Sequence, residues 1–259
     1  MAELPDLTVF ANILTNRFVG KMLKKIEVVI EAKLNVSAKE LEAAIAGKKL
    51  QAVTREGKTL QMHFSDKQVL GLHLMLRGEL VLIDETNPKP KYAILVFHFA
   101  DTGFALVDLQ KMATPTLNPP VSAVPDALAA EMDFNYFSEL LAKKRTMIKA
   151  LLMDQHLIRG IGNSYTDEIL WHAKISPFSI AKAIPPNKVK VLYNSLGKVL
   201  NKAIADLSKE NGNELKGELR DFMKVHSARL KQSPTGGSIK TDKIGGRLTY
   251  YTEEQELFN

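Results

Sequence analysis

Two glycines and an asparagine separate two helix-like segments in the second half of the chain. The run is Gly160-Ile161-Gly162-Asn163, and the segment 164–172 that follows it has helical spacing. Glycine lets a backbone turn sharply and lets another group approach it closely. Asn163 is of a type that caps helices, and the N–H groups at a helix start favour a phosphate. These four residues predict either a phosphate-binding turn or an ordinary helical hairpin.

The longer run that contains this turn resembles a known DNA-binding element. Residues 154–173, DQHLIRGIGNSYTDEILWHA, closely resemble the helix–two-turn–helix of the formamidopyrimidine-DNA glycosylase and endonuclease VIII family. The first residues, Met1-Ala2-Glu3-Leu4-Pro5-Asp6, resemble that family's Met-Pro-Glu-Leu-Pro-Glu. The resemblance implies that the chain binds double-stranded DNA with a damaged or abasic nucleotide. It also implies that Asn163 holds the DNA backbone beside the lesion.

The resemblance further implies a chemistry for the first residues. In the family, removal of the initiator methionine exposes a proline amine that attacks C1′ of the damaged nucleotide. Here Ala2 stands in place of that proline, and its amine would have a reference pKa of about 7.7–8.0. Glu3 would transfer protons as the sugar ring opens. Because a primary amine gives an imine that must be protonated before it withdraws electrons, we expect slower β-elimination than with proline.

Two further motifs assign basic residues to the DNA. Arg55-Glu56-Gly57-Lys58 resembles the family's hairpin R-x-G-K, which makes Lys58 a catalytic and phosphate-binding residue. The run 243–250, KIGGRLTY, resembles the tip of the family's β-hairpin finger, V-G-G-R-G-T, and implies that Arg247 grips a phosphate. Lys149 is expected on a phosphate as well. Taken alone, Lys58 would be interpreted as a solvated turn charge.

Three residues are expected to fill the space that a flipped-out nucleotide leaves. The run 72–78, LHLMLRG, resembles L-H-L-G-M-S-G and puts Leu76 at the position of the family's methionine. The run 108–113, DLQKMA, resembles D-P-R-R-F-G and puts Lys111 and Met112 at the arginine and phenylalanine positions. Lys111 lacks the planar guanidinium that can pair with the orphaned base. Without the resemblance, Leu76 and Met112 would be interpreted as core residues.

Composition favours a polyanionic partner and excludes thiolate chemistry. The formal charge of +6 and the pI near 9.3 suit DNA, although many proteins with neutral partners are as basic. There are no cysteines, and the six histidines show no ligand spacing, so we expect a zincless finger, no metal and no cofactor. With no signal pattern and no membrane-length apolar run, we expect a cytoplasmic, nucleoid-associated monomer of bacterial type that does not bind membranes.

The elements that must position these residues predict an α+β fold. We expect an N-terminal helix and a two-sheet β-sandwich over 1–117, a linker over 118–134, a helix–two-turn–helix domain over 135–228 and a zincless β-hairpin finger over 229–259. Four prolines between 114 and 126 are typical of a linker. Apolar alternation predicts strands at 49–54, 59–64, 68–74, 79–83, 94–99 and 104–109, with a turn at Asp101-Thr102-Gly103. Apolar spacing predicts helices at 5–20, 136–153, 164–172 and 187–208.

Two functions from different classes stay open. The first is a DNA glycosylase with abasic-site lyase activity on oxidised bases; the second is a catalytically silent or weak binder of damaged or abasic DNA. Glu3 favours the enzyme, because a pure binder has no chemical need for a carboxylate beside the amine. Ala2, Lys111 and Met112 favour the binder. The segment 211–231 is short where purine-selective relatives carry a longer loop, which favours oxidised pyrimidines, formamidopyrimidines or abasic sites over 8-oxoguanine.

Overall fold

The N-terminal helix forms where the apolar spacing predicts it. The computed structural model describes residues 1–259, and its first helix, α1, spans Leu4–Phe18. Glu3 is the N-cap of this helix, and its backbone N–H donates to the Asp6 carboxylate over 2.9 Å. This bond belongs to a capping box, which fixes the direction in which the chain enters the helix. The buried apolar residues of α1 include Leu4, Leu7, Val9, Phe10, Ile13, Leu14 and Phe18.

Contacts between residues divide the chain into two compact units. The first comprises Met1–Val121 together with Leu207–Glu218. The second comprises Ser122–Asp206 together with Leu219–Asn259. Each unit is built from two stretches of the chain, and the short stretch 207–218 belongs with the N-terminal residues.

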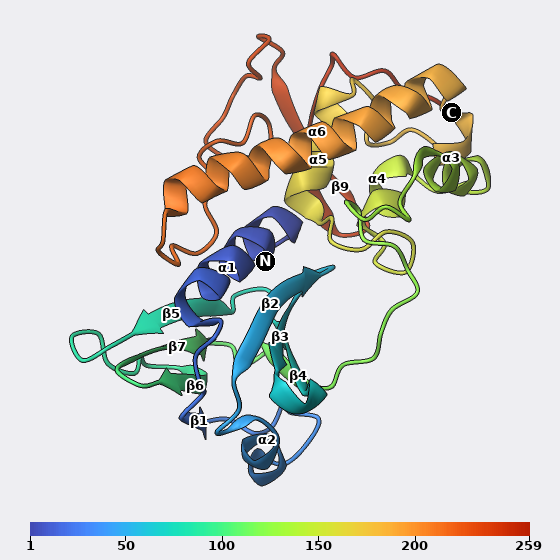
Figure 1. The fold of residues 1–259 in the computed structure, drawn as a ribbon. Helices are drawn as coiled ribbons and strands as arrows, with labels where there is room; N and C mark the ends of the chain where they lie inside the picture. The colour runs from blue at the N-terminus through green and yellow to red at the C-terminus, as the bar shows by residue number, and fades with distance from the viewer. The chain divides into compact units, whose positions relative to one another are not determined.

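Two four-stranded antiparallel sheets make up most of the first unit (Figure 1). Their strand orders are β1-β6-β7-β5 and β2-β3-β4-β8. This arrangement, with α1 beside β2, confirms the predicted helix and two-sheet sandwich. The elements are β1 (Lys25–Val28), α2 (Ala38–Ile45), β2 (Leu50–Glu56), β3 (Thr59–Phe64), the 3₁₀ turn η1 (Ser65–Lys67), β4 (Val69–His73), β5 (Glu79–Ile83), β6 (Ala93–Phe99), β7 (Thr102–Val107) and β8 (Thr114–Leu117).

Four of these elements are absent from the sequence-based prediction. They are β1, α2, η1 and β8, all eight residues or shorter. Strand β8 lies in the proline-containing segment that was expected to begin the linker, and its Pro115 pairs with Leu72 of β4. Because β8 is the last strand of its sheet, proline is tolerated there without the loss of a central ladder bond.

The turn between β6 and β7 begins one residue earlier than expected and ends two residues earlier. Phe99 pairs with Thr102, so Ala100 and Asp101 form the turn, and Ala100 has a φ of 54°. Gly103, expected in the turn, is instead inside β7. A Cβ there would lie 2.0 Å from the carbonyl oxygen of Phe97, so this glycine serves close strand approach and not the turn.

Aromatic rings join α1 to one sheet in the core of the first unit. The ring of Phe18 on α1 lies 4.8 Å from that of Phe99 and 5.4 Å from that of Phe104, measured between centroids. Phe97 stacks on Phe104 at 4.4 Å. All four side chains are buried, and aromatic pairs of this kind add to the free energy gained from burial. The cluster holds α1 against β6 and β7.

The second unit contains helices and one two-stranded hairpin. No helix in the structure is both long and apolar enough to cross a membrane. The two-stranded hairpin confirms the predicted finger at the C-terminal end. The elements are α3 (Phe134–Ala142), α4 (Ile148–Met153), α5 (Asn163–His172), the 3₁₀ turn η2 (Ala181–Ala183), α6 (Pro186–Asn211, of which residues to Asp206 belong to this unit), β9 (Ile239–Ile244) and β10 (Arg247–Thr252).

The helix predicted over 136–153 is broken into α3 and α4. The break occurs because the first amides of α4 bond to a distant segment instead of to a preceding helical turn. Ile148 N–H donates to Ser179 O over 2.8 Å, and Lys149 N–H donates to Pro177 O over 3.4 Å. The break falls on the polar run 143–146, KKRT, which interrupts the apolar spacing that the predicted helix requires.

We predict that Phe104→Ala destabilises the first unit by about 3–5 kcal/mol, because it leaves a cavity among three buried rings. Hydrogen exchange of the β6 and β7 amides measures this change. Val29→Ala, at a site that is 44% exposed, is the control and is expected to stay within about 0.5 kcal/mol of the parent chain. Equal protection in both variants would contradict the assigned role of the ring cluster.

Candidate functional site

Ala2 lies at the wall of a cavity in the first unit. The cavity has a volume of about 590 Å³, and Ala2 itself is buried. Leu76 and Arg77 line one part of the wall, and Gly217 and Glu218 line another. The space is large enough for a nucleobase and is lined by both charged and apolar groups. Ala2 therefore stands beside a cavity that can take a ligand with both polar and apolar groups.

A carboxylate on the segment 211–218 holds the chain's amino terminus. The ammonium of Met1 lies 2.7 Å from Oε1 and 3.0 Å from Oε2 of Glu218. The segment is itself tied to α1, because the Arg17 guanidinium donates twice to Asn213 O, over 2.5 and 2.9 Å. The sequence offered no motif that could have identified Glu218. The segment expected to be only a shortened loop thus forms a wall of the cavity.

Glu3 is placed by the helix that it caps. Its residue is 2% exposed, and its backbone N–H is held by Asp6. A carboxylate at this point lies at the positive end of the α1 dipole, which attracts a negative charge. Ala2 and Glu3, expected to act together, are adjacent residues on one fixed segment.

Lys58 is presented by a tight hairpin, as the sequence predicts. Strands β2 and β3 leave only Gly57 and Lys58 between the paired ends, and Gly57 has a φ of 56° that suits glycine. Arg55 ties this hairpin to α1, since its Nε donates to Thr8 Oγ1 over 2.9 Å. Burial, and then the charge of Lys58, lower the pKa of the His73 imidazole. Lys58 is therefore near the end of β4.

Leu76 is on a turn that the backbone fixes closely. Met75 has a φ of 56°, and its N–H donates to Nδ1 of the neutral His73 ring over 3.0 Å. Gly78 N–H donates to Leu74 O over 2.8 Å, and a Cβ on Gly78 would lie 2.2 Å from that oxygen. This turn leaves the Leu76 side chain 54% exposed at the cavity. Leu76 is not a core residue.

Lys111 and Met112 lie on a second fixed turn of the same unit. The buried carboxylate of Asp108 accepts from the N–H groups of Gln110, Met112 and Ala113, over 2.8 to 2.9 Å. Lys111 has a φ of 56°, and Met112 is 41% exposed. In the sequence, the only signal for Asp108 was its match to the aspartate of the family's D-P-R-R-F-G. Its carboxylate holds the two side chains at the surface.

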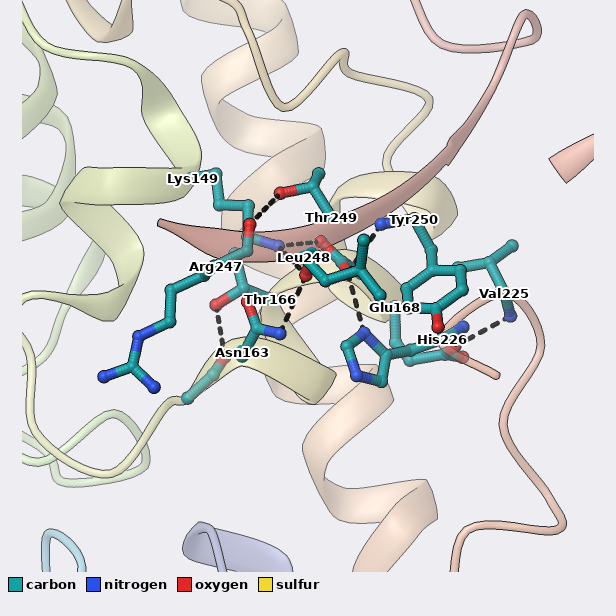
Figure 2. Close-up of polar contacts among 12 residues, drawn as sticks. Lys149, Asn163, Thr166, Glu168, Val225, His226, Arg247, Leu248, Thr249 and Tyr250 are labelled. Carbon is teal, nitrogen blue, oxygen red and sulfur yellow. Dashed lines mark hydrogen bonds and ion pairs between the residues drawn. The ribbon is translucent and has the colours of Figure 1, made fainter. Parts of the chain in front are cut away.

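The second unit brings Asn163 to the tip of the finger. Gly162, not Asn163, is the N-cap of α5, which corrects the expected cap. The Asn163 amide instead donates from Nδ2 to Leu248 O over 2.9 Å, while its Oδ1 is buried without a partner (Figure 2). Gly245 and Gly246, with φ of 55° and 74°, turn the chain into β10, where Arg247 is exposed. Figure 2 shows the Arg247 side chain extending away from the bonded cluster.

Lys149 is not at the surface where a phosphate contact was expected. Its side chain is fully buried, and its Nζ lies 2.6 Å from Oδ1 of Asp167. The same Nζ is 3.4 Å from Leu248 O. An ammonium inside the protein needs such a partner, because burial of an unpaired charge is strongly unfavourable. An internal ion pair thus replaces the expected phosphate contact.

The arrangement provides two kinds of chemistry. In the first unit, Ala2 lies beside a cavity, and Glu3 follows it at the start of α1. In the second, Asn163 and Arg247 place an amide and a guanidinium at one hairpin tip. No group of histidine, aspartate and glutamate side chains in the structure could hold a metal ion. The chemistry available is that of an amine, a carboxylate, an amide and a guanidinium.

Comparisons with known proteins agree over nearly the whole chain. Residues 1–114 match the formamidopyrimidine-DNA glycosylase N-terminal domain, and residues 124–212 match the formamidopyrimidine-DNA glycosylase H2TH domain. The formamidopyrimidine-DNA glycosylase of Lactobacillus gasseri is 30% identical over 271 residues, which cover 97% of each chain. That of Carboxydothermus hydrogenoformans is 30% identical and covers 77% of this chain and 76% of its own.

Solved structures give the same result. The complex of the Lactococcus lactis Fpg with abasic-site DNA superposes with a TM-score of 0.86 at 26% identity, covering 98% of this chain and 100% of the other. The complex of the same protein with DNA that contains FAPY-dG has a TM-score of 0.87 at 28% identity, with equal coverage. These similarities extend over both units of the chain.

We predict that Asp108→Asn destabilises the first unit by about 2–3 kcal/mol, because one of two acceptor oxygens becomes an NH₂ group facing backbone N–H donors. Faster hydrogen exchange at residues 110–113 and a lower urea midpoint report the change. Asp101→Asn, an exposed turn position, is the matched control and should leave both unchanged. Unaltered exchange in Asp108→Asn would show that the carboxylate does not hold this turn.

Proposed function

We propose that this chain, which belongs to the formamidopyrimidine-DNA glycosylase family, is a base-excision-repair DNA glycosylase that releases oxidised bases from double-stranded DNA. The observation that carries the proposal is the position of Ala2, the residue directly before Glu3, at a cavity of about 590 Å³ that is large enough for a nucleobase. The relatives in solved structures are bound to DNA with an abasic site or a formamidopyrimidine, which supports the same class of partner.

The proposed reaction uses the amine of Ala2 after removal of Met1. The amine attacks C1′, the bond from C1′ to the base breaks, and the base leaves with a proton. Glu3 supplies a proton to the ring oxygen as the sugar opens, which gives an imine between Ala2 and C1′. Once protonated, this imine withdraws electrons, so that a C2′ proton is lost and the 3′ phosphate leaves. The second half is the abasic-site lyase activity.

Phosphate contacts are assigned to Lys58, Asn163 and Arg247. Each is a donor of the kind that positions a duplex without reading its sequence. The Asn163 amide has two N–H groups, and only one of them is used on Leu248 O, so the second can meet a phosphate oxygen. Arg247 is exposed at the first position of β10, which suits a contact with a phosphate. Lys149 is buried and paired with Asp167, so no phosphate contact is assigned to it.

Three exposed side chains are assigned to the space left by a flipped nucleotide. Leu76 and Met112 are 54% and 41% exposed, and each is held by a fixed turn, which supports insertion into a duplex. Lys111 is exposed beside Met112. Because flipping a base costs a few kcal/mol, side chains that replace its stacking make the extrahelical state more favourable. We expect oxidised pyrimidines, formamidopyrimidines and abasic sites to be preferred.

A silent binder of damaged DNA is the second candidate. The observation that favours it is Ala2 at the position of the family's proline, together with the ion pair between Met1 and Glu218. If Met1 stays on the chain, the amine is displaced by one residue from the position that the family uses. Such a protein would bind abasic DNA through the same cations without forming a covalent intermediate.

We predict that borohydride traps the processed chain on a duplex with one abasic site. Borohydride reduces an imine to a stable amine, so mass spectrometry should place the adduct on Ala2. Ala2→Pro is the matched control, and it should trap faster because a secondary amine gives a permanently charged iminium. Tight binding by a chain without Met1 and without any adduct would instead establish the silent binder.

We predict that Glu3→Gln lowers base excision at least about 100-fold while DNA affinity changes by less than about 3-fold, because proton transfer is lost and phosphate contacts are kept. Single-turnover excision and fluorescence anisotropy measure the two quantities. Glu42→Gln, an exposed carboxylate on α2, makes the same chemical change away from the cavity and should alter neither. Full excision by Glu3→Gln would remove Glu3 from the mechanism.

A further inference from the structure

Asp167 collects donors from three separate parts of the second unit. Its Oδ1 lies 2.6 Å from Lys149 Nζ on α4. Its Oδ2 lies 2.7 Å from His226 Nδ1 and accepts the Tyr250 N–H of β10 over 2.9 Å. Asp167 is 1% exposed, so these bonds are made away from solvent. Figure 2 shows this cluster beside the finger strand.

The finger needs such an anchor. It consists of only two strands, β9 and β10, and a lone two-stranded hairpin is at best marginally stable in water. Its residues include no cysteine, and no side-chain group in the structure is suited to hold a metal ion. The anchor must therefore come from packing and hydrogen bonds, and α5 is the helix that contacts β10.

The bonds of Asp167 reach the main chain of β10 at two points, directly and through Lys149. Lys149 Nζ, held by Asp167, and Asn163 Nδ2 converge on Leu248 O at 3.4 and 2.9 Å. Two residues further along β10, the Tyr250 N–H is bound directly by Asp167. The main chain beside Arg247 is thus fixed by one buried carboxylate, although Arg247 itself is exposed.

The next residue, Glu168, anchors the segment that carries His226. Its carboxylate accepts the N–H groups of Lys224, Val225 and His226 over 2.8 to 3.0 Å. Burial raises the pKa of the Glu168 carboxyl, while these amide bonds act in the opposite direction. The His226 ring also packs edge-on against Tyr250, with centroids 4.8 Å apart. His226 is therefore held where it can donate to Asp167.

We propose that Asp167 is a positioning residue for DNA binding, which fixes the finger in place of a metal ion and thereby aims Arg247 at its phosphate. This inference depends on the proposed function in one respect, which is the contact between Arg247 and DNA. Asp167 touches no DNA, and its charge has the wrong sign for a polyanion. On electrostatic grounds alone, loss of this charge should strengthen binding. The positioning role requires the opposite result.

The first test is the affinity of Asp167→Asn for an abasic duplex across a range of salt concentrations. We expect affinity to fall at least about 10-fold and the salt slope to become shallower by about 0.9 for each phosphate that the protein no longer neutralises. Arg247→Ala should show the same change in slope. Asp242→Asn removes the same charge from an exposed position on β9 and should bind at least as well as the parent chain. Unchanged or tighter binding by Asp167→Asn would overturn the proposal.

A second variant separates positioning from folding. Lys149→Met with Asp167→Leu removes both members of the buried ion pair, so no unpaired buried charge is left and the chain is expected to fold. It lacks the donor to Leu248 O and the acceptor for Tyr250 N–H, so its DNA affinity should fall as in Asp167→Asn. Parent-like affinity in this folded variant would show that Asp167 does not position the finger for DNA.

A third measurement needs no DNA. Trp171 is the only tryptophan, and its Nε1–H donates to Glu254, just beyond β10, over 3.2 Å. Its fluorescence therefore reports whether the finger is docked. In Asp167→Asn we expect a red shift of Trp171 emission and a transition at lower urea than the parent shows. If neither the parent chain nor its variants bind DNA but Trp171 responds in this way in Asp167→Asn, the proposed function fails and the role of Asp167 as the finger's anchor is kept. An unchanged Trp171 signal in Asp167→Asn rejects that role.

Discussion

A chain terminus can act as a nucleophile only if it is held still, and a terminus is ordinarily the most mobile part of a protein. In this chain the first turn of α1 meets that requirement. The helix is buried along its apolar face, Asp6 closes its start, and Ala2 is 2% exposed directly before it. The hairpin that carries Lys58 and the segment that carries Glu218 are both tied to the same helix, through Arg55 and Arg17. The placement of the chain's amino-terminal end thus depends on the burial of one helix.

The turns that present side chains to a ligand share one device. In each, a side-chain acceptor takes one or more backbone N–H groups, so that the main chain is fixed and the side chain is left outside. Asp108 does this for the turn of Met112, and His73 does it for the turn of Leu76. In the second unit Asp167 holds β10 next to Arg247. Preorganised main chain lowers the conformational entropy that binding has to remove.

Local patterns predicted much of this fold. The α1 helix, the β2–β3 hairpin and the Gly245-Gly246 finger turn follow from apolar spacing and glycine positions that lie within a few residues of one another. The break between α3 and α4 was not predicted, because it depends on hydrogen bonds from the start of α4 to the distant segment 177–179. The role of Lys149 was missed for a similar reason. Asp167 is 18 residues from Lys149, 59 from His226 and 83 from Tyr250, and no local pattern encodes such contacts.

The absence of cysteine has a consequence for the conditions in which this protein works. Oxidants that damage DNA bases also oxidise thiolates, and a finger held by zinc-bound cysteines loses its ligands in the same event. Here the finger is held by carboxylate, imidazole, ammonium and amide groups, none of which is on that path of sulfur oxidation. None of these contacts therefore depends on a reduced thiolate or on a zinc ligand.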